Sequence, residues 1–189
     1  MNFWKLLGSF FIVMLMLNHP LRAQSVNFAL TTSPNITFDF NTIQKYENGI
    51  TIMNACTLNV EVSGTQWDLY VGATTTNVGY WDVTNTYGST GSLPTIGIMQ
   101  LQFRNASNTS LVSGFFSLQD ISTPTYIIGT ASAPDAAVSC PAVGTNTPGN
   151  YSANPNCYKF NVDLKIVPGF SLRPGLYSLR IDYILIQDL

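Results

Sequence analysis

The sequence predicts an all-β protein in which two antiparallel sheets pack face to face as a β-sandwich. Three observations support this prediction. Apolar and polar residues alternate in many short runs, which is the period of a strand with one buried face. Turn-forming residues separate these runs at close spacing, and no run has a convincing helical period. Such a pattern is typical of two packed antiparallel sheets.

The stretch from Cys56 to Val71 carries the clearest alternation. It contains two apolar sets at alternate positions: Leu58, Val60 and Val62, then Trp67, Leu69 and Val71. The residues Ser63-Gly64-Thr65 between the sets favour a turn, so we predict a β-hairpin with one face toward the core. Trp67 is the largest side chain expected in that core.

Further alternating runs predict the remaining strands, at 26–30, 36–40, 99–103, 126–128, 160–166 and 177–185. Ile184 and Ile186 make the last run apolar on both faces, as expected of a central or covered strand. Two long loops interrupt the pattern, Gly72 to Gly97 and Ala131 to Tyr158, and the prolines of the second exclude a regular core strand. The stretch Leu111 to Leu118 fits either a strand or a short helix.

Residues 1–23 have the features of a secretory signal peptide. Lys5 precedes an apolar run from Leu6 to Leu17, and small residues lead to a cleavage point before Gln24. The run is shorter than the ~20 residues of a membrane-spanning helix. We therefore expect a signal peptide at 1–23, a single β-sandwich domain at 24–189, and no transmembrane segment after cleavage.

Composition indicates an exported protein that does not bind nucleic acid. Charged residues make up 10% of the chain and aromatic residues 12%. Loss of Lys5 and Arg22 with the signal peptide leaves a mildly acidic chain without a basic run. Such a chain is expected outside the cytoplasm, at the cell surface, in the medium or in a periplasm.

The three cysteines are compatible with a disulfide in an exported protein. Cys140 and Cys157 bracket part of the second long loop and form the preferred pair, whose closure would stabilise by about 3 kcal/mol. Cys56 is then a small buried hydrophobe at the start of a strand. The alternative, in which Cys56 pairs with either of the others, remains open at this point.

The sequence provides few groups for catalysis or metal binding. The single His, His19, lies in the signal peptide, which removes the usual triads and imidazole metal sites from the mature chain. Asp68, Asp82 and Asp120 are weak candidates for a carboxylate pair, with solvated positions as the simpler interpretation. We therefore expect a non-enzymatic protein without catalytic residues, metal or cofactor.

An aromatic loop supplies the one candidate ligand site. Tyr80, Trp81, Asp82 and Tyr87 combine rings that can stack on a sugar with a carboxylate that can bind its hydroxyls. The alternative is that Tyr80 and Trp81 close one end of the core. The sequence therefore predicts a candidate glycan-binding site in this loop.

The segments LNVEVSGTQWDLYV, KFNVDLKIV and RPGLYSLRIDYIL together resemble small secreted bacterial β-sandwich proteins of the pilin-like and surface-coat type. This resemblance implies an immunoglobulin-like sandwich, in which a Pro-Gly-x-Tyr turn leads into the last strand. It also implies a Gram-negative exported protein of the cell surface or periplasm. No functional residue is carried over from it.

These features predict a structural or adhesive cell-surface subunit that assembles with itself or with other surface subunits. Strand addition is the expected mode, because a strand edge accepts a neighbouring strand through backbone hydrogen bonds. The segment from Gln24 to Ser33 is the candidate donor, and an ordinary first strand in its own sheet is the alternative. The second candidate function is a carbohydrate-binding module that uses the aromatic loop.

Overall fold

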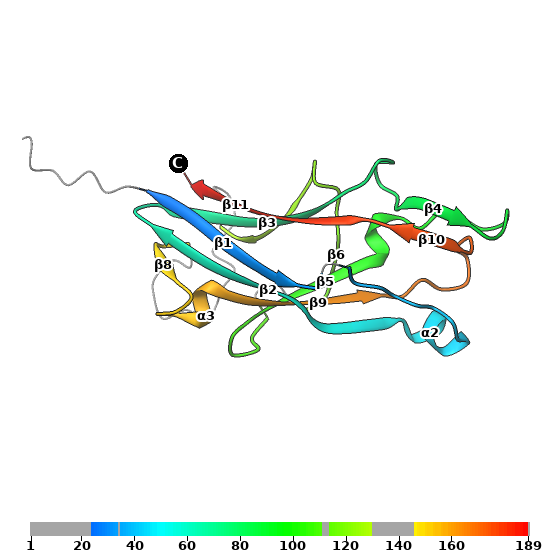
Figure 1. The fold of residues 1–189 in the computed structure, drawn as a ribbon, viewed down its shortest axis with the longest axis horizontal. Coiled ribbons are helices and arrows are strands. Elements are labelled where there is room, and N and C mark those ends of the chain that lie inside the picture. The colour runs from blue at the N-terminus through cyan, green and yellow to red at the C-terminus, as the bar shows by residue number, and fades with distance from the viewer. Residues whose placement is uncertain (1–23, 34, 111–113, 130–145, 189) are drawn as a thin grey trace, which may run out of the picture.

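The computed structural model describes residues 24–33, 35–110, 114–129 and 146–188 (Figure 1). Strands make up most of this part of the chain. The elements are β1 (Ser25–Thr32), α2 (Ile43–Asn48), β2 (Ile50–Ser63), β3 (Gln66–Thr74), β4 (Asp82–Thr86), a 3₁₀ turn (Ile96–Ile98), β5 (Met99–Asn105), β6 (Phe116–Ser117), β7 (Thr125–Ile128), β8 (Gly149–Asn150), α3 (Pro155–Tyr158), β9 (Lys159–Ile166), β10 (Gly175–Ser178) and β11 (Arg180–Asp188).

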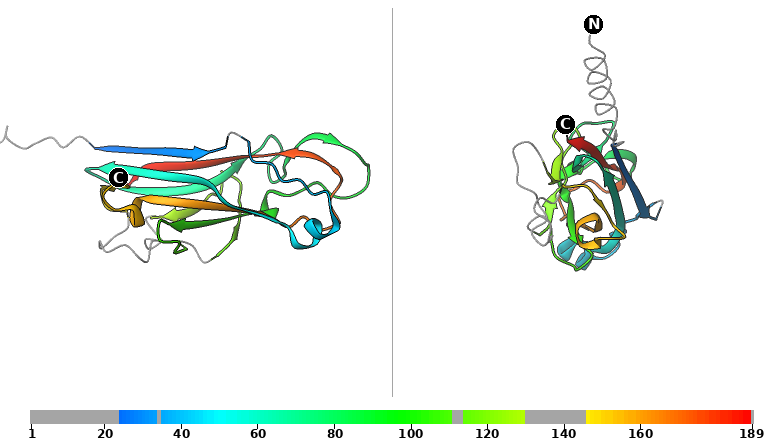
Figure 2. Two further views of the ribbon diagram at one scale, coloured as in Figure 1. Left: turned by 60° about the horizontal axis from the view of Figure 1, so that its bottom comes forward. Right: turned by 90° about the vertical axis from the view of Figure 1, so that its left-hand side faces the viewer.

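These strands form one large and two smaller antiparallel sheets, which confirms the all-β class. The large sheet, called sheet A here, has the order β1-β2-β9-β5-β6, with β8 also paired to β2. Sheet B has the order β11-β3-β7, and β10 pairs with β4 alone. The molecule is elongated, with β8 and α3 near one end and α2, β4 and β10 near the other (Figures 1 and 2).

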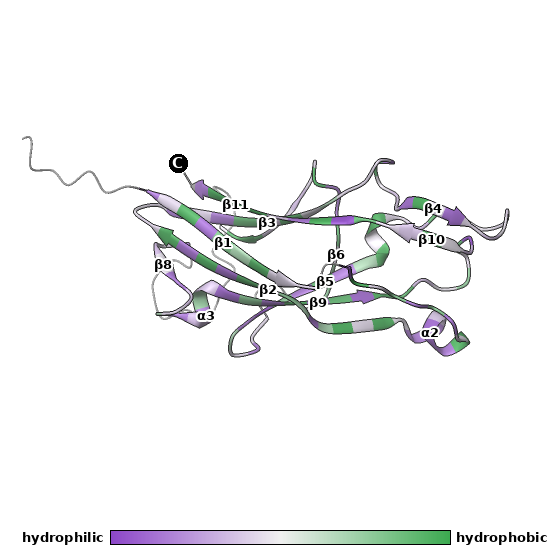
Figure 3. Cartoon of the chain, viewed as in Figure 1, coloured by the Kyte–Doolittle hydropathy of each residue, from purple (hydrophilic) through white to green (hydrophobic). Residues whose placement is uncertain are grey.

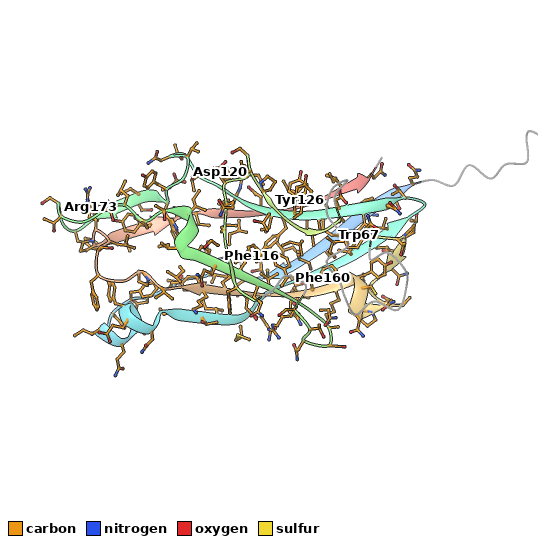
Figure 4. The ribbon with its side chains drawn as sticks, turned by 180° about the vertical axis from the view of Figure 1, so that it is seen from behind. Trp67, Phe116, Asp120, Tyr126, Phe160 and Arg173 are labelled. Atoms are coloured by element: carbon orange, nitrogen blue, oxygen red, sulfur yellow. The ribbon has the colours of Figure 1, made fainter. Side chains whose placement is uncertain are left out.

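The core lies between sheets A and B, and the alternation of the sequence correctly predicts which side chains enter it. The two apolar sets of the stretch 56–71 are all buried. Trp67 packs against Phe160 across the sheets, with ring centroids 6.3 Å apart, and its indole Nε1 donates to the carbonyl oxygen of Thr147 at 3.1 Å. Figure 4 shows both rings in the space between the sheets, and Figure 3 shows hydrophobic and hydrophilic positions alternating along the strands.

The predicted hairpin between β2 and β3 is wrong. β2 pairs with β1, β8 and β9 in sheet A, whereas β3 pairs with β11 and β7 in sheet B. The turn at Gly64, whose φ is 72°, therefore carries the chain from one sheet to the other. A period of two specifies which face is buried, and both strands still present their apolar face to the shared core.

Three other expectations differ from the structure. Residues 36–40 form no strand, although Ile36, Phe38 and Phe40 still pack against the core. The final run is divided at Leu179 into β10 and β11. β11 occupies the edge of sheet B, so its two apolar faces do not mark a central strand.

A buried ion pair joins three neighbouring strands of sheet A. Asp163 in β9 is fully buried, and its carboxylate accepts from Nε and Nη2 of Arg104 in β5, both at 2.6 Å. The same carboxylate accepts from the backbone N–H of Asn54 at 2.7 Å, and Arg104 Nη2 donates to Asn54 Oδ1 at 2.9 Å. Asn54 has a φ of 52° and lies where the register between β2 and β9 shifts. The pair thus fixes a bulge in β2.

Replacing Arg104 by Met is expected to lower the free energy of unfolding by about 3–5 kcal/mol, because the Asp163 carboxylate would remain buried without its cation. Urea unfolding of the two proteins measures the difference. The matched control is Arg180→Met, which breaks an exposed ion pair with Asp182 and should change the free energy by less than about 1 kcal/mol. Equal stability of Arg104→Met and the parent protein would contradict this role.

Candidate functional site

The aromatic segment at the entry to β4 is partly structural. The backbone N–H of Trp81 donates to the carbonyl of Pro94 at 3.0 Å, and its indole Nε1 donates to the carbonyl of Thr95 at 3.1 Å. The ring is partly buried and packs against the core. Tyr80 and Tyr87, by contrast, are 41% and 65% exposed. Trp81 therefore anchors the segment, and the two tyrosines are its accessible rings.

Asp82 borders a different hollow from Trp81 and Tyr87. Its carboxylate accepts from the backbone N–H of Thr76 at 2.7 Å and borders a polar depression of about 430 Å³. Trp81 and Tyr87 line a larger hollow. Consecutive residues of an extended chain point to opposite sides, so neighbours in the sequence need not share a surface. The ligand role of this segment stays a prediction.

The larger hollow lies between the sheets and has a volume of about 710 Å³. We call it the inter-sheet groove. Its floor includes the buried side chains of Leu164 and Ile166 from β9, and Ile181 from β11 lines it as well. Phe38 and Phe40, from the segment between β1 and α2, contribute to its side. Apolar residues of these three separate parts of the chain thus border one space.

Cys56 and Tyr183 also line the groove and contact each other. Cys56 Sγ donates to the Tyr183 hydroxyl at 3.3 Å. Burial raises the pKa of the Cys56 thiol, although the hydrogen bond to Tyr183 partly offsets this effect. Burial also raises the pKa of Tyr183 well above its ordinary value. Both groups are therefore neutral at physiological pH.

One of the three cysteines is a free thiol, and the disulfide expected between the other two stays a prediction. Cys56 is free and buried, which agrees with its interpretation as a small hydrophobe and excludes its pairing with the other two. Cys157 is buried in α3, but its expected partner Cys140 lies outside the described residues. The bond between Cys140 and Cys157 therefore stays a prediction.

Asp68 and Asp120 do not form a close carboxylate pair. Asp120 bridges to Ala73, which lies five positions along β3 from Asp68, or roughly 16 Å at strand spacing. That distance exceeds the ~10 Å upper limit for a pair that hydrolyses glycosides. Asp120 instead accepts from the backbone N–H and hydroxyl of Ser122, and these bonds lower its pKa.

Neither models of known families nor curated proteins match this chain. Within the described ranges, no three residues among His, Cys, Asp and Glu gather as metal ligands would. No helix in these ranges is long and apolar enough to cross a bilayer.

Sequence reasoning did not single out the groove or Arg173, which borders it. Arg173 stands in a Pro-Gly turn, where an arginine is usually solvated, and nothing in its local sequence distinguishes it. The groove itself joins residues that are more than a hundred positions apart. A contact between such distant segments leaves no local pattern.

The thiol of Cys56 should react slowly with a disulfide reagent in the folded protein at pH 8. Its pKa is raised in the folded state, so the reactive thiolate forms only at higher pH, and burial blocks access. Unfolding in urea removes both effects. The absorbance of the thiolate that the reagent releases then gives the number of reactive protein thiols.

Without reductant, urea should expose one thiol if Cys140 and Cys157 are bonded, and three if they are not. The control is Cys56→Ser, which should expose none in the bonded case. Fast reaction of Cys56 in the folded protein would contradict its burial.

Proposed function

We propose that this chain is an exported, non-enzymatic subunit of a cell-surface structure, with a structural or adhesive role. In this proposal residues 1–23 direct export, and the two sheets have an immunoglobulin-like arrangement. Subunits associate with copies of themselves or with other surface subunits by strand addition. The observation that carries the proposal is the weak attachment of β1 to its own sheet.

β1 is held by a single ladder along β2. Its eight residues pair antiparallel with β2, from Ser25 opposite Ser63 to Thr32 opposite Cys56. Its other edge has no strand partner within the described part of the chain. The apolar side chains that face inward are poorly covered, since Phe28 is 39% and Leu30 42% exposed. Release of β1 therefore costs the ladder and the covered part of side chains that remain more than a third exposed even when β1 is docked.

Exchange of β1 between two copies would restore the same ladder. If β1 leaves its own β2 and pairs with β2 of a neighbour, every backbone hydrogen bond reforms with an identical partner. Such an exchange is a low-cost route to oligomers, because the contacts in the oligomer equal those in the monomer. The free-energy difference is then set mainly by chain concentration and by strain in the connecting segment after Ser33.

β11 offers a second edge for association. Its nine residues pair only with β3, so one side of the strand lacks a ladder within the described residues. Ile186 on its outer face is 39% exposed. An apolar edge strand of this length normally needs cover, and a neighbouring subunit would provide it.

Phe28→Asp is expected to abolish assembly while the monomer stays folded. The charge weakens docking of β1 on any copy of β2. The oligomer depends entirely on this docking, whereas the monomer keeps the buried core around Trp67 without it. The mature protein is released from its native cells and run on gels without boiling and after boiling. The parent should give a ladder that boiling collapses to monomer. Thr31→Asp, on the opposite face of β1, is the matched control and should keep the ladder.

Cross-linking distinguishes exchange from other modes of association. Ser25 and Ser63 are register partners whose hydroxyl oxygens lie 3.2 Å apart. A mixture of Ser25→Cys chains with Ser63→Cys chains should form a covalent heterodimer under oxidation. Ser25→Cys mixed with Thr57→Cys, which is out of register, should not. A monomer band in every lane would refute strand exchange.

Glycan binding remains the second candidate function, because Tyr80 and Tyr87 present exposed rings seven positions apart in the same segment. Tyr87→Ala should weaken binding to any glycan that the parent retains, by roughly tenfold if one stacking contact is lost. Binding to a glycan array measures the effect. Tyr87 is a better test than Trp81, whose replacement would also break the anchoring hydrogen bond from its indole Nε1 to Thr95. Unchanged binding would remove this surface from consideration.

A further inference from the structure

Side chains do not fill the space between the sheets at the end of the molecule that contains α2, β4 and β10. The inter-sheet groove occupies this space, with a volume of about 710 Å³. Sites for small molecules have volumes of about 300–1,000 Å³, with apolar walls and a few placed polar groups. Protein interiors are normally close-packed, so an apolar space of this size favours an occupant.

The walls of the groove are apolar on several sides. Cys56, Leu164 and Ile166 form part of its floor, and each is at most 3% exposed. Ile181 lines the groove from β11, and Phe38 lines it from the segment after β1. Polar side chains such as Thr37 and Ser178 also line the groove, so it suits a ligand whose apolar part lies on the floor and whose polar part lies elsewhere.

One cation at the groove lacks a partner. Arg173 borders the groove, and its Nε is buried without a hydrogen-bond partner. The other groove arginine, Arg180, is paired with Asp182. Asp39, the carboxylate along the groove, accepts from the side chain of Asn41 at 2.9 Å. Among the described residues, then, Arg173 has no carboxylate to neutralise it. Figure 4 places Arg173 at the end of the long axis opposite Trp67.

From these observations we propose that the inter-sheet groove binds a linear amphiphile, an alkyl chain with one anionic head group, whose head group pairs with Arg173. The alkyl chain lies between the sheets against the apolar floor. A guanidinium offers several N–H donors to a carboxylate or phosphate, and the buried Nε gains the partner that it lacks. A peptide strand fits less well, because it brings an N–H and a carbonyl at every residue to apolar side chains. This proposal does not depend on strand exchange.

Long-chain fatty acids are the probes that test the proposal. Binding of decanoate, dodecanoate, tetradecanoate and palmitate to the purified, delipidated mature protein (residues 24–189) is measured by calorimetry. Affinity should rise with chain length, by roughly fourfold for each methylene that enters the groove, because each buried methylene contributes hydrophobic free energy. Fluorescence of Trp81, which lines the groove, should change on binding. Affinity that is independent of chain length would overturn the proposal.

Variants separate the two halves of the ligand. Arg173→Met should weaken palmitate binding at least tenfold while leaving the binding of uncharged hexadecanol unchanged, because only palmitate has a charged head group. Lys159→Met, which removes a cation outside the groove, is the matched control and should bind palmitate as the parent does. Ile181→Trp, which fills the groove, should weaken both ligands.

Three results would overturn the proposal. They are failure of palmitate to bind the folded parent protein, weakening of hexadecanol binding by Arg173→Met to the same extent as palmitate binding, and retention of both ligands by Ile181→Trp. A fourth contrary result combines two observations: the parent protein binds no lipid, and Ile181→Trp no longer self-associates. This result would indicate that a second copy of the chain occupies the groove. All of these readouts use monomeric protein or a separate assembly assay. Failure of strand exchange therefore leaves the lipid test intact.

Discussion

The buried ion pair between Arg104 and Asp163 is the interaction on which the shape of sheet A depends. A carboxylate in the middle of a sheet is tolerable only when charge and hydrogen bonds compensate its lost hydration. Here the guanidinium supplies two donors and the backbone of Asn54 a third. This third hydrogen bond connects the ion pair to Asn54, whose backbone lies in the left-handed region of φ/ψ space. The ion pair therefore also stabilises the bulge in β2.

This bulge separates two halves of the molecule that differ in packing. On one side, β2 resumes its register with β9 at Cys56 and runs beside β1, and the core around Trp67 is filled. On the other side, β2 continues toward α2 without β1 beside it, and the sheets enclose the groove (Figure 1). A bulge bends its strand, which is the usual way for a sheet to change direction without breaking.

Each of the two proposals concerns one of these halves. Strand exchange concerns β1, whose ladder ends at Thr32, and lipid binding concerns the groove, which begins beside Leu30 and Cys56. The halves meet at the bulge, where Leu30 and Thr32 of β1 also line the groove. Together the two proposals describe a surface subunit that would carry a lipid between its sheets.

The sequence by itself determined the all-β class and the buried face of each long strand, because a period of two is a local property. It placed Leu58, Trp67 and Phe160 in the core without knowledge of their partners. Tertiary structure alone decided that β2 and β3 belong to different sheets, because alternation specifies a face and not a neighbour. It also decided that Trp81 and Asp82 line different hollows, and that a turn arginine borders an apolar groove. Each of these features arises from contacts between segments far apart in the chain, and such contacts leave no periodic signal in the residues themselves.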